Sequence, residues 1–550
     1  MCTRSKFVLA LLALFVAVAP ARADKTTVCT ITVNSADEKE AFRRSLAPDK
    51  YRFVELVEHG RADWLSSACR AGVQCDVLII SGHYDGGNEF FSEHVEASEF
   101  LPVAELERVS CSGSCPGLFS RLKEVYLFGC NTLNPEAQRT VSANAVASLV
   151  QGGLPKGEAE RLVRSLNARY GESSRDRMRL VFHDVPVIYG FSSVAPLGPT
   201  AAGILSRYFQ AAGTSEIASG RASPRMLGQF SAHSLTVTRG MTETDPLASV
   251  RRDVCQFADD RSSTAQKIGF IHQLLQRPMP EVRMFMDRIE RYVATLDDQD
   301  RQDRDVERAL AAIARDAPTR ARYLAYARDT DPPASRARMI DLARDLGWLS
   351  TDENRAERVQ LFGDLLARSG AGPAEVDLAC SLNRDHDFDG LYDDAANPHR
   401  PGDAARAAIR ACLGSDEGHA RALEALLGAS DADSRVAQAY LRHRPITTIS
   451  ELRTLTSGIA QMRGSDAQVR ALQALAGHPV SDPESLEVLA QLFPQAETWS
   501  VQSAIAGVLI RADYRSIARP EIVQAFRDHR RKSPYGADVI DALIRRMQQP

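Results

Sequence analysis

The chain has 550 residues and a formal net charge of −4. A net charge so close to zero lacks the excess of basic residues that is typical of nucleic-acid-binding proteins, so we expect no nucleic-acid partner. The length suggests two to four domains, and the pattern of apolar residues changes in character about halfway along the sequence.

The first residues have the three parts of a secretory signal peptide. Arg4 and Lys6 give a positive start, residues 7–18 form an apolar run, and Ala21-Arg22-Ala23 is an A-x-A cleavage site. A transmembrane anchor needs about 20 apolar residues, and this run is shorter. The sequence therefore predicts a signal peptide over 1–23, no membrane span after its cleavage, and a periplasmic or secreted protein.

The number of cysteines suggests disulfide bonds in an exported chain. Removing Cys2 with the signal leaves nine (10 − 1 = 9), and export favours disulfide bonds. An odd number leaves at least one cysteine unpaired, either as an intermolecular link or as a reactive thiol. With Cys130 as the free thiol, the expected pairs are Cys69/Cys75, Cys111/Cys115, Cys380/Cys412 and, by subtraction, Cys29/Cys255.

Short apolar runs alternate with amphipathic stretches over residues 24–248. Amphipathic helices are expected at 137–150 and 158–170. Continuous apolar strands separated by helices predict an α/β domain with a buried, mostly parallel sheet and helices on both faces. The expected strands are 28–33, 52–57, 76–80, 124–128 and two runs within 180–191, around LVF and VIYGF.

From residue 249 the strand-like runs vanish, and apolar residues recur at three- and four-residue spacing, as in 267–276, 281–296 and 336–346. We expect a helical region over 249–430 and a repeat of 34 residues over 431–550. Two helices per unit fit that period and favour a HEAT-like solenoid, with a chance match in an Ala/Leu-rich region as the alternative. The matched pairs are Pro445/Pro479, Leu452/Leu486, Leu455/Leu489, Ile459/Phe493, Gln468/Gln502, Ala471/Ile505 and Leu475/Leu509.

The leucines of each unit should form one buried face, and neighbouring units must stack to cover it. Charged residues between them, such as Arg453 and Glu487, should then point to solvent. We expect the stacked helices to hold a protein partner or to present a substrate.

Two of the expected strands end in residues that can carry nucleophilic chemistry. The run 76–80 leads into Ser81-Gly82-His83, and the run 124–128 leads into Gly129-Cys130. In an open parallel sheet, ligands bind beyond the carboxyl ends of the strands, so both side chains should share that edge. A thiol needs a neighbour that promotes the thiolate, and a histidine can do this and later protonate the leaving amine.

These two strand ends resemble the caspase-like fold of cysteine peptidases, and within it the CHAT and separase-like branches. Those families have a strand followed by Gly-His-Gly, and a second strand followed by a small residue, Cys and a Ser/Thr-containing turn, which FGCNT at 128–132 resembles. His83 precedes Cys130 by 47 residues, near the separation of about 50 in caspases, although the caspase Gln-Ala-Cys signature is absent. Residues 187–193 and a helix at 200–209 resemble a late strand and helix of CHAT domains, so the resemblance covers about 70–210.

The resemblance implies Cys130 as the nucleophile and His83 as its general base and acid, with no cofactor required. Gly82, Tyr84 and Gly129 would give backbone support to the oxyanion. The family usually has glycine where this chain has Tyr84, which tolerates fewer backbone angles. The implied function is an exported cysteine endopeptidase that acts on a protein or peptide. The alternative is a catalytically inactive relative that serves as an extracytoplasmic binding module.

An acidic loop over 385–396 resembles EF-hand and thrombospondin-type calcium loops, because it begins D-x-D-x-D-G-x-x-D. Calcium prefers several oxygen ligands at alternate positions of a tight loop. Ala396 replaces the acidic residue at the twelfth position, which should weaken binding; a solvated acidic loop is the alternative. The expected calcium ligands are Asp385, Asp387, Asp389, the Leu391 carbonyl and Asp393.

Overall fold

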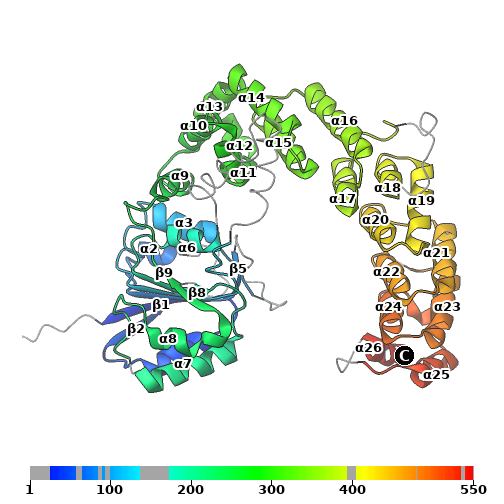
Figure 1. Ribbon diagram of the computed structural model, residues 1–550, viewed down its shortest axis with the longest axis horizontal. Helices are drawn as coiled ribbons and strands as arrows, with labels where there is room; N and C mark the ends of the chain where they lie inside the picture. The colour runs from blue at the N-terminus through cyan, green and yellow to red at the C-terminus, as the bar shows by residue number, and fades with distance from the viewer. Residues whose placement is uncertain are drawn as a thin grey trace, which may run out of the picture. The chain divides into compact units, whose positions relative to one another are not determined.

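The structure is a computed structural model of the chain, shown in Figure 1, and it falls into two compact units, Met1–Ile313 and Ala314–Pro550. The expected signal peptide and the stretches 137–150 and 158–170 lie outside the residues that it describes. No helix in the described part of the chain is long and apolar enough to cross a bilayer. The described residues are 25–56, 65–84, 89–92, 100–136, 173–212, 214–392, 404–446, 448–478, 480–533 and 539–548.

Unit 1 is built on a six-stranded sheet with the order β2-β1-β3-β7-β8-β9. The first five strands are parallel, and β9 pairs antiparallel with β8. The expected mostly parallel sheet is therefore confirmed. The strands are β1 (Thr26–Thr32), β2 (Tyr51–Glu55), β3 (Val77–Ser81), β7 (Glu124–Phe128), β8 (Val187–Phe191) and β9 (Leu235–Thr238).

Helices cover both faces of this sheet (Figure 1). Every residue of β3, β7 and β8 is buried, as expected for central strands between two helical layers. Along β3, Leu78 and Ile80 face one layer, and Val77 and Ile79 face the other. One layer holds α2 (Ser66–Arg70), α3 (Val103–Cys111) and α6 (Ser174–Val181); the other holds α1 (Asp37–Ser45), α7 (Gly198–Ala212) and α8 (Pro224–Gln229).

The run LVF at 180–182, expected as a strand, is instead the end of helix α6, so this prediction is wrong. The Ser173 hydroxyl caps the helix by accepting a hydrogen bond from the Asp176 N–H at 3.0 Å. Met178 and Val181 are fully buried at a three-residue interval, while Arg179 is only partly buried. The helical period of the preceding residues decides the conformation, because an apolar run of three fits a helix end as well as a strand.

Three disulfide pairings also differ from expectation, whereas Cys380–Cys412 is confirmed. The bonds join Cys29 to Cys75, Cys69 to Cys115 and Cys111 to Cys255. β1 and β3 are adjacent strands, and Cys75 lies just before β3, so the Cα atoms of Cys29 and Cys75 are 5.6 Å apart although 46 positions separate the two residues. Among the described cysteines, Cys130 is the one without a disulfide bond, as expected.

Five helices that follow the sheet belong to unit 1, so the expected boundary near 248 lies inside this unit. The Cys111–Cys255 bond ties α9 to α3. Glu107 of α3 accepts hydrogen bonds of 2.7 and 2.9 Å from Arg288 of α11; the Glu107 side chain is buried, and the Arg288 side chain is 9% exposed. These helices are α9 (Ala248–Ala258), α10 (Thr264–Leu275), α11 (Met279–Ala294), α12 (Asp298–Gln302) and α13 (Arg304–Ala314).

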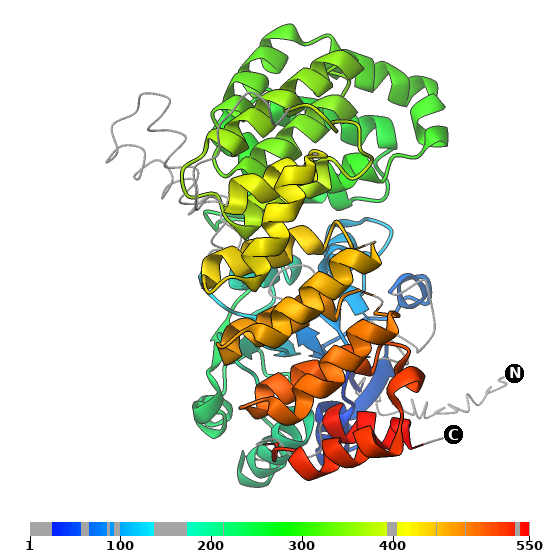
Figure 2. The same ribbon diagram turned by 90° about the vertical axis from the view of Figure 1, so that its right-hand side faces the viewer.

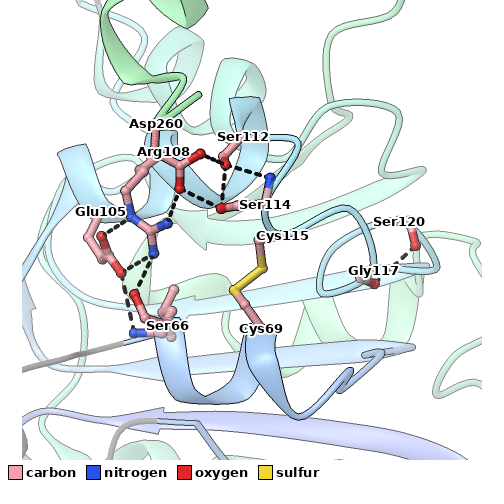
Figure 3. The surroundings of a disulfide bond; sticks show 11 residues. Ser66, Cys69, Glu105, Arg108, Ser112, Ser114, Cys115, Gly117, Ser120 and Asp260 are labelled. Atoms are coloured by element: carbon pink, nitrogen blue, oxygen red, sulfur yellow. Dashed lines mark hydrogen bonds and ion pairs between the residues drawn. A yellow bond between two sulfur atoms is a disulfide. The ribbon is translucent and has the colours of Figure 1, made fainter. Parts of the chain in front are cut away.

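The loop after α3 is held by a further disulfide and a cluster of polar side chains (Figure 3). Its Cys115 is bonded to Cys69 of α2. The Asp260 carboxylate, just beyond α9, accepts hydrogen bonds from Ser112 and Ser114 and pairs with Arg108 at 3.1 Å. The covalent and ionic contacts together fix the first helices after the sheet to the layer formed by α2 and α3.

The described residues of unit 2 form helices without strands, as expected, and from α18 to α24 each helix packs beside the second helix that follows it, as α20 does with α22 and α22 with α24 (Figures 1 and 2). The helices are α14 (Ala317–Arg328), α15 (Pro333–Asp345), α16 (Thr351–Ala367), α17 (Pro373–Leu382), α18 (Ala404–Cys412), α19 (Asp416–Leu427), α20 (Asp431–Leu441), α21 (Ile449–Gln461), α22 (Ser465–Leu475), α23 (Pro483–Leu492), α24 (Trp499–Leu509), α25 (Pro520–His529) and α26 (Val539–Met547).

The 34-residue repeat corresponds to two pairs of helices, α21 with α22 and α23 with α24. Gln468 donates from Nε2 to the Ile459 carbonyl at 2.9 Å, and the matching Gln502 donates to the Phe493 carbonyl at 3.2 Å. The same buried hydrogen bond therefore recurs in both 34-residue repeats. A chance similarity in composition does not explain this recurrence. The matched apolar positions are also buried, namely Leu452, Leu455, Ile459, Ala471, Leu475, Leu486, Leu489, Phe493, Ile505 and Leu509. Pro479 lies outside the described residues.

Arg453 does not simply point to solvent, as its position between the leucines suggests. Its side chain is 47% exposed, but the guanidinium donates to Asp482 at 2.7 and 3.1 Å and pairs with Glu484 at 2.6 Å. Asp482 caps α23 by accepting a hydrogen bond from Ser485, so Arg453 links one repeat unit to the start of the next. This contact holds the pKa of Asp482 well below its ordinary value.

Candidate functional site

The carboxyl ends of β1, β3 and β7 meet at one edge of the sheet. Ser81 of β3 is in register with Phe128 of β7, and the Gly82 N–H donates to the Phe128 carbonyl at 3.1 Å. His83 and Cys130 come directly after these strand ends, and both line the same pocket. The other residues that line it are Asn34, Ser35, Glu38, Gly82, Phe128, Gly129, Ala195, Pro196, Leu197 and Gly198.

Cys130 is a partly exposed free thiol at the start of a sharp turn. Its Sγ accepts a hydrogen bond from the Ala195 N–H at 3.3 Å. This hydrogen bond holds the sulfur in one position beside the loop that follows β8. Asn131 follows with a φ of 58°, in the left-handed region, and its N–H donates to the Ser193 carbonyl at 2.7 Å.

Thr132 holds this turn against β8. Its buried hydroxyl donates to the Gly129 carbonyl at 3.2 Å and accepts from the Phe191 N–H at 3.0 Å. The Leu133 N–H donates to the Phe191 carbonyl at 3.0 Å. The N–H groups of Asn131 and Leu133 are thus engaged with the β8 end of the sheet. They are not free to hold an oxyanion beside Cys130.

The three residues expected to give backbone support lie close together. A side chain at Gly129 would clash, because a Cβ there would lie 2.8 Å from the Gly82 carbonyl oxygen and 3.1 Å from the Tyr84 Cβ. Tyr84 is buried, with its ring 4.9 Å from that of Phe90 in the hydrophobic core. The Tyr84 side chain is therefore directed into the core, and it does not line the pocket.

His83 belongs to a small antiparallel sheet of β4 (His83–Tyr84), β5 (Glu89–Phe91) and β6 (Phe100–Pro102). Phe91 is its partner in the register, and their ring centroids are 5.5 Å apart. Phe91 in turn pairs with Phe100, which is 44% exposed. Residues opposite each other share a face of a sheet, so aromatic side chains extend from the histidine along this face.

Glu38 is a pocket residue that the sequence analysis did not identify. It lies in the first turn of α1, is 4% exposed, and its Oε2 has no hydrogen-bond partner among the described residues. Burial raises the pKa of this carboxyl from 4.5 to about 7, which its own N–H and the Ser81 hydroxyl offset only in part. In the sequence, an acidic residue in the first turn indicates only a favourable helix start.

The acidic loop is described as far as Tyr392, so Asp393 lies outside the described residues. Asp385 and Asp387 are exposed. The Asp389 carboxylate accepts a hydrogen bond of 2.7 Å from the Asn383 amide and contacts His386 Nδ1 at 2.8 Å. Protein groups therefore occupy both oxygens of the third expected ligand.

Arg444 completes the contacts of this loop. Its guanidinium lies 2.9 Å from His386 Nε2 and donates to the Asn383 carbonyl at 2.8 Å. Within the described ranges, no group of three or more His, Cys, Asp or Glu side chains is arranged to hold a metal ion. Calcium binding by the loop stays a prediction.

Comparison with known proteins adds no relative that identifies the site: no family model, curated protein or solved structure matches the chain significantly. The resemblance to caspase-like peptidases therefore rests on the two strand ends and their order along the chain. The chemical interpretation depends on Cys130, His83 and the groups around them in the pocket.

Proposed function

We propose that this chain is an exported cysteine endopeptidase of the caspase-like type, with Cys130 as nucleophile and His83 as general base and acid. One observation carries the proposal. The free cysteine among the described residues shares a pocket with a histidine, and both follow the carboxyl ends of neighbouring parallel strands. Buried cysteines and lone histidines are common in proteins, but their combination at this edge of an α/β sheet is typical of a reaction centre.

The reaction would proceed in two steps. His83 takes the thiol proton, Cys130 forms a thioester bond to the substrate carbonyl carbon, and the C–N bond breaks as His83 protonates the leaving amine. A water molecule then attacks the thioester, gives a proton to His83, and releases the carboxylic acid and the thiol. The hydrogen bond from the Ala195 N–H holds the sulfur in the pocket at the start of this cycle. No cofactor enters either step.

The remaining parts of the chain fit an exported enzyme with a binding region. Four disulfide bonds are compatible with a periplasmic or secreted location. The paired helices of unit 2 would form HEAT-like repeats that hold a protein substrate or partner, because stacked helical pairs offer an extended surface.

Thiol labelling tests the reaction centre directly. Iodoacetamide should modify Cys130 rapidly in the folded protein, and His83→Ala should slow this modification. His233→Ala is the matched control, because His233 belongs to the same unit but does not line the pocket. A peptide library should be cleaved by the wild type and left intact by Cys130→Ala. Cleavage that survives in Cys130→Ala would overturn the proposal.

A non-enzymatic binding module is the second candidate, and Tyr84 is the observation that favours it. A tyrosine after His83 replaces the glycine of the active families, so the oxyanion support at this position differs from theirs. Slow labelling of Cys130, together with no cleavage of the library, would favour this candidate.

A further inference from the structure

The pocket of the candidate site is lined by a carboxyl group that has no role in the proposed peptidase reaction. Glu38 is 4% exposed and lines the pocket together with Cys130 and His83. Its Oε2 atom is buried and has no hydrogen-bond partner among the described residues. The next basic side chains on its helix are engaged elsewhere, since Lys39 pairs with Glu55 at 3.1 Å and Arg43 with Glu40 at 3.6 Å.

A carboxyl in this state is unfavourable for the unliganded protein. Leaving a buried polar atom without a hydrogen-bond partner destabilises a protein, and more so when the group is charged. Glu38 borders a pocket, so a ligand can supply the partner that the Oε2 atom lacks. The group that would relieve the penalty most is a positively charged N–H donor, because charge-assisted hydrogen bonds are about twice as strong as neutral ones.

The walls of the pocket suit the rest of such a ligand. Pro196 and Leu197 line it from the loop between β8 and α7, and Leu197 is 68% exposed. The start of α7 lies so close to the segment after β1 that a Cβ at Gly198 would be 2.2 Å from the Ser35 Oγ. An aliphatic stem can therefore pack against Pro196 and Leu197 while its charged end reaches Glu38, as long basic side chains commonly do.

We infer that Glu38 binds a cationic nitrogen of the substrate, in the pocket where Cys130 and His83 act. The nitrogen comes from an arginine or lysine side chain or from the amino terminus of a peptide. Its position beside the scissile bond rests on the proposed function, whereas binding of the cation by Glu38 does not.

Direct binding tests the cation site without any catalytic step. Butylguanidinium and its neutral analogue butylurea have similar shapes, and their affinities for the full chain can be compared by calorimetry. We expect the wild type to bind the cation at least about ten-fold more tightly, and Glu38→Gln to bind both ligands about equally. Glu40→Gln on the same helix should keep the wild-type preference. If the wild type binds butylguanidinium and butylurea with equal affinity, the inference is wrong. This result can be obtained without any variant.

Substrate probes distinguish the two sources of the nitrogen. Acetylated peptidyl chloromethyl ketones that end in arginine or in neutral citrulline report the side-chain source through the rate of Cys130 alkylation. Peptides without basic residues, with a free or an acetylated amino terminus, report the terminal source. Cleavage with no preference for either cationic group would refute the inference and keep the peptidase. A Glu38-dependent cation preference without any cleavage would refute the peptidase and keep the inference.

Discussion

The main-chain N–H of Ala195, in the loop that follows β8, donates a hydrogen bond to the sulfur of Cys130 at 3.3 Å. A hydrogen bond contributes about 0.5–1.5 kcal/mol, so this contact should hold the sulfur in one orientation in the pocket. Ala195→Pro removes the donor, and we expect about ten-fold slower labelling of Cys130 by iodoacetamide. Ala195→Gly keeps the N–H and serves as the control. Equal labelling rates in the two variants would show that the contact is unimportant for reactivity.

Gly129 should not tolerate even one added methyl group. A Cβ there would meet the Gly82 carbonyl oxygen at 2.8 Å, and backbone atoms cannot move aside as a flexible side chain can. We expect Gly129→Ala to lower the unfolding free energy by about 1–3 kcal/mol and to slow Cys130 labelling. Gly269→Ala in α10, where nothing lies within 4 Å of the new Cβ, should leave stability unchanged or raise it. Denaturant unfolding of both variants is the measurement.

Glu38 should make the protein less stable as pH rises. Its folded pKa of about 7 exceeds the ordinary 4.5, so the folded state binds the proton more tightly than the unfolded state does. Its contribution is therefore fully present below about pH 4.5 and is lost as pH rises through 7, by about 3 kcal/mol at most. Glu38→Gln should gain stability over the wild type at about pH 8 and little at about pH 4. A difference between the two proteins that does not change with pH would contradict this expectation.

Leu489 should be essential to the stacking of the helical repeats. It is fully buried in α23, and aspartate there would be a buried charge without a partner. We expect Leu489→Asp to cost several kcal/mol, against about 0.5 kcal/mol or less for Gln491→Asp at an exposed position of the same helix. Similar urea midpoints for the two variants would mean that this face is not a packed core.

Calcium should raise the melting temperature if the acidic loop binds it, because a ligand of the folded state stabilises that state by mass action. Binding requires Asp389 to exchange its contacts with Asn383 and His386 for the ion. Asp387→Asn, which changes an exposed carboxylate, should reduce the effect. A melting temperature that responds neither to calcium nor to a chelator would leave the loop as solvated charge held by Arg444.

The central strands could be predicted from the sequence because burial on both faces makes them continuously apolar. The runs 76–80 and 124–128 match β3 and β7 within one residue at each end. The edge strand β9 is only half-buried along its length, so its pattern carries no comparable signal. The disulfide between Cys29 and Cys75 depends on which strands are neighbours, and that order is not encoded locally.

The candidate site was predictable where chemistry and strand ends coincide, as for Cys130 and His83. Glu38 was not, because its significance comes from the surrounding residues that bury it rather than from its position in α1. The contact of Arg453 was not predictable either, because its partner Asp482 lies 29 positions away, at the start of the next 34-residue repeat.

The recurring glutamine contact sets a rule for how the chain can change in length. Gln468 and Gln502 each reach the carbonyl at the end of the preceding helix, and each helix pair repeats after 34 residues. Duplicating one whole 34-residue repeat would reproduce this contact in the added copy. Adding or removing a single residue within a helix pair would instead misplace the glutamine. The series of helix pairs can therefore lengthen by duplication, or shorten by deletion, of whole 34-residue repeats, and the length of its surface can change without altering the sheet that holds Cys130.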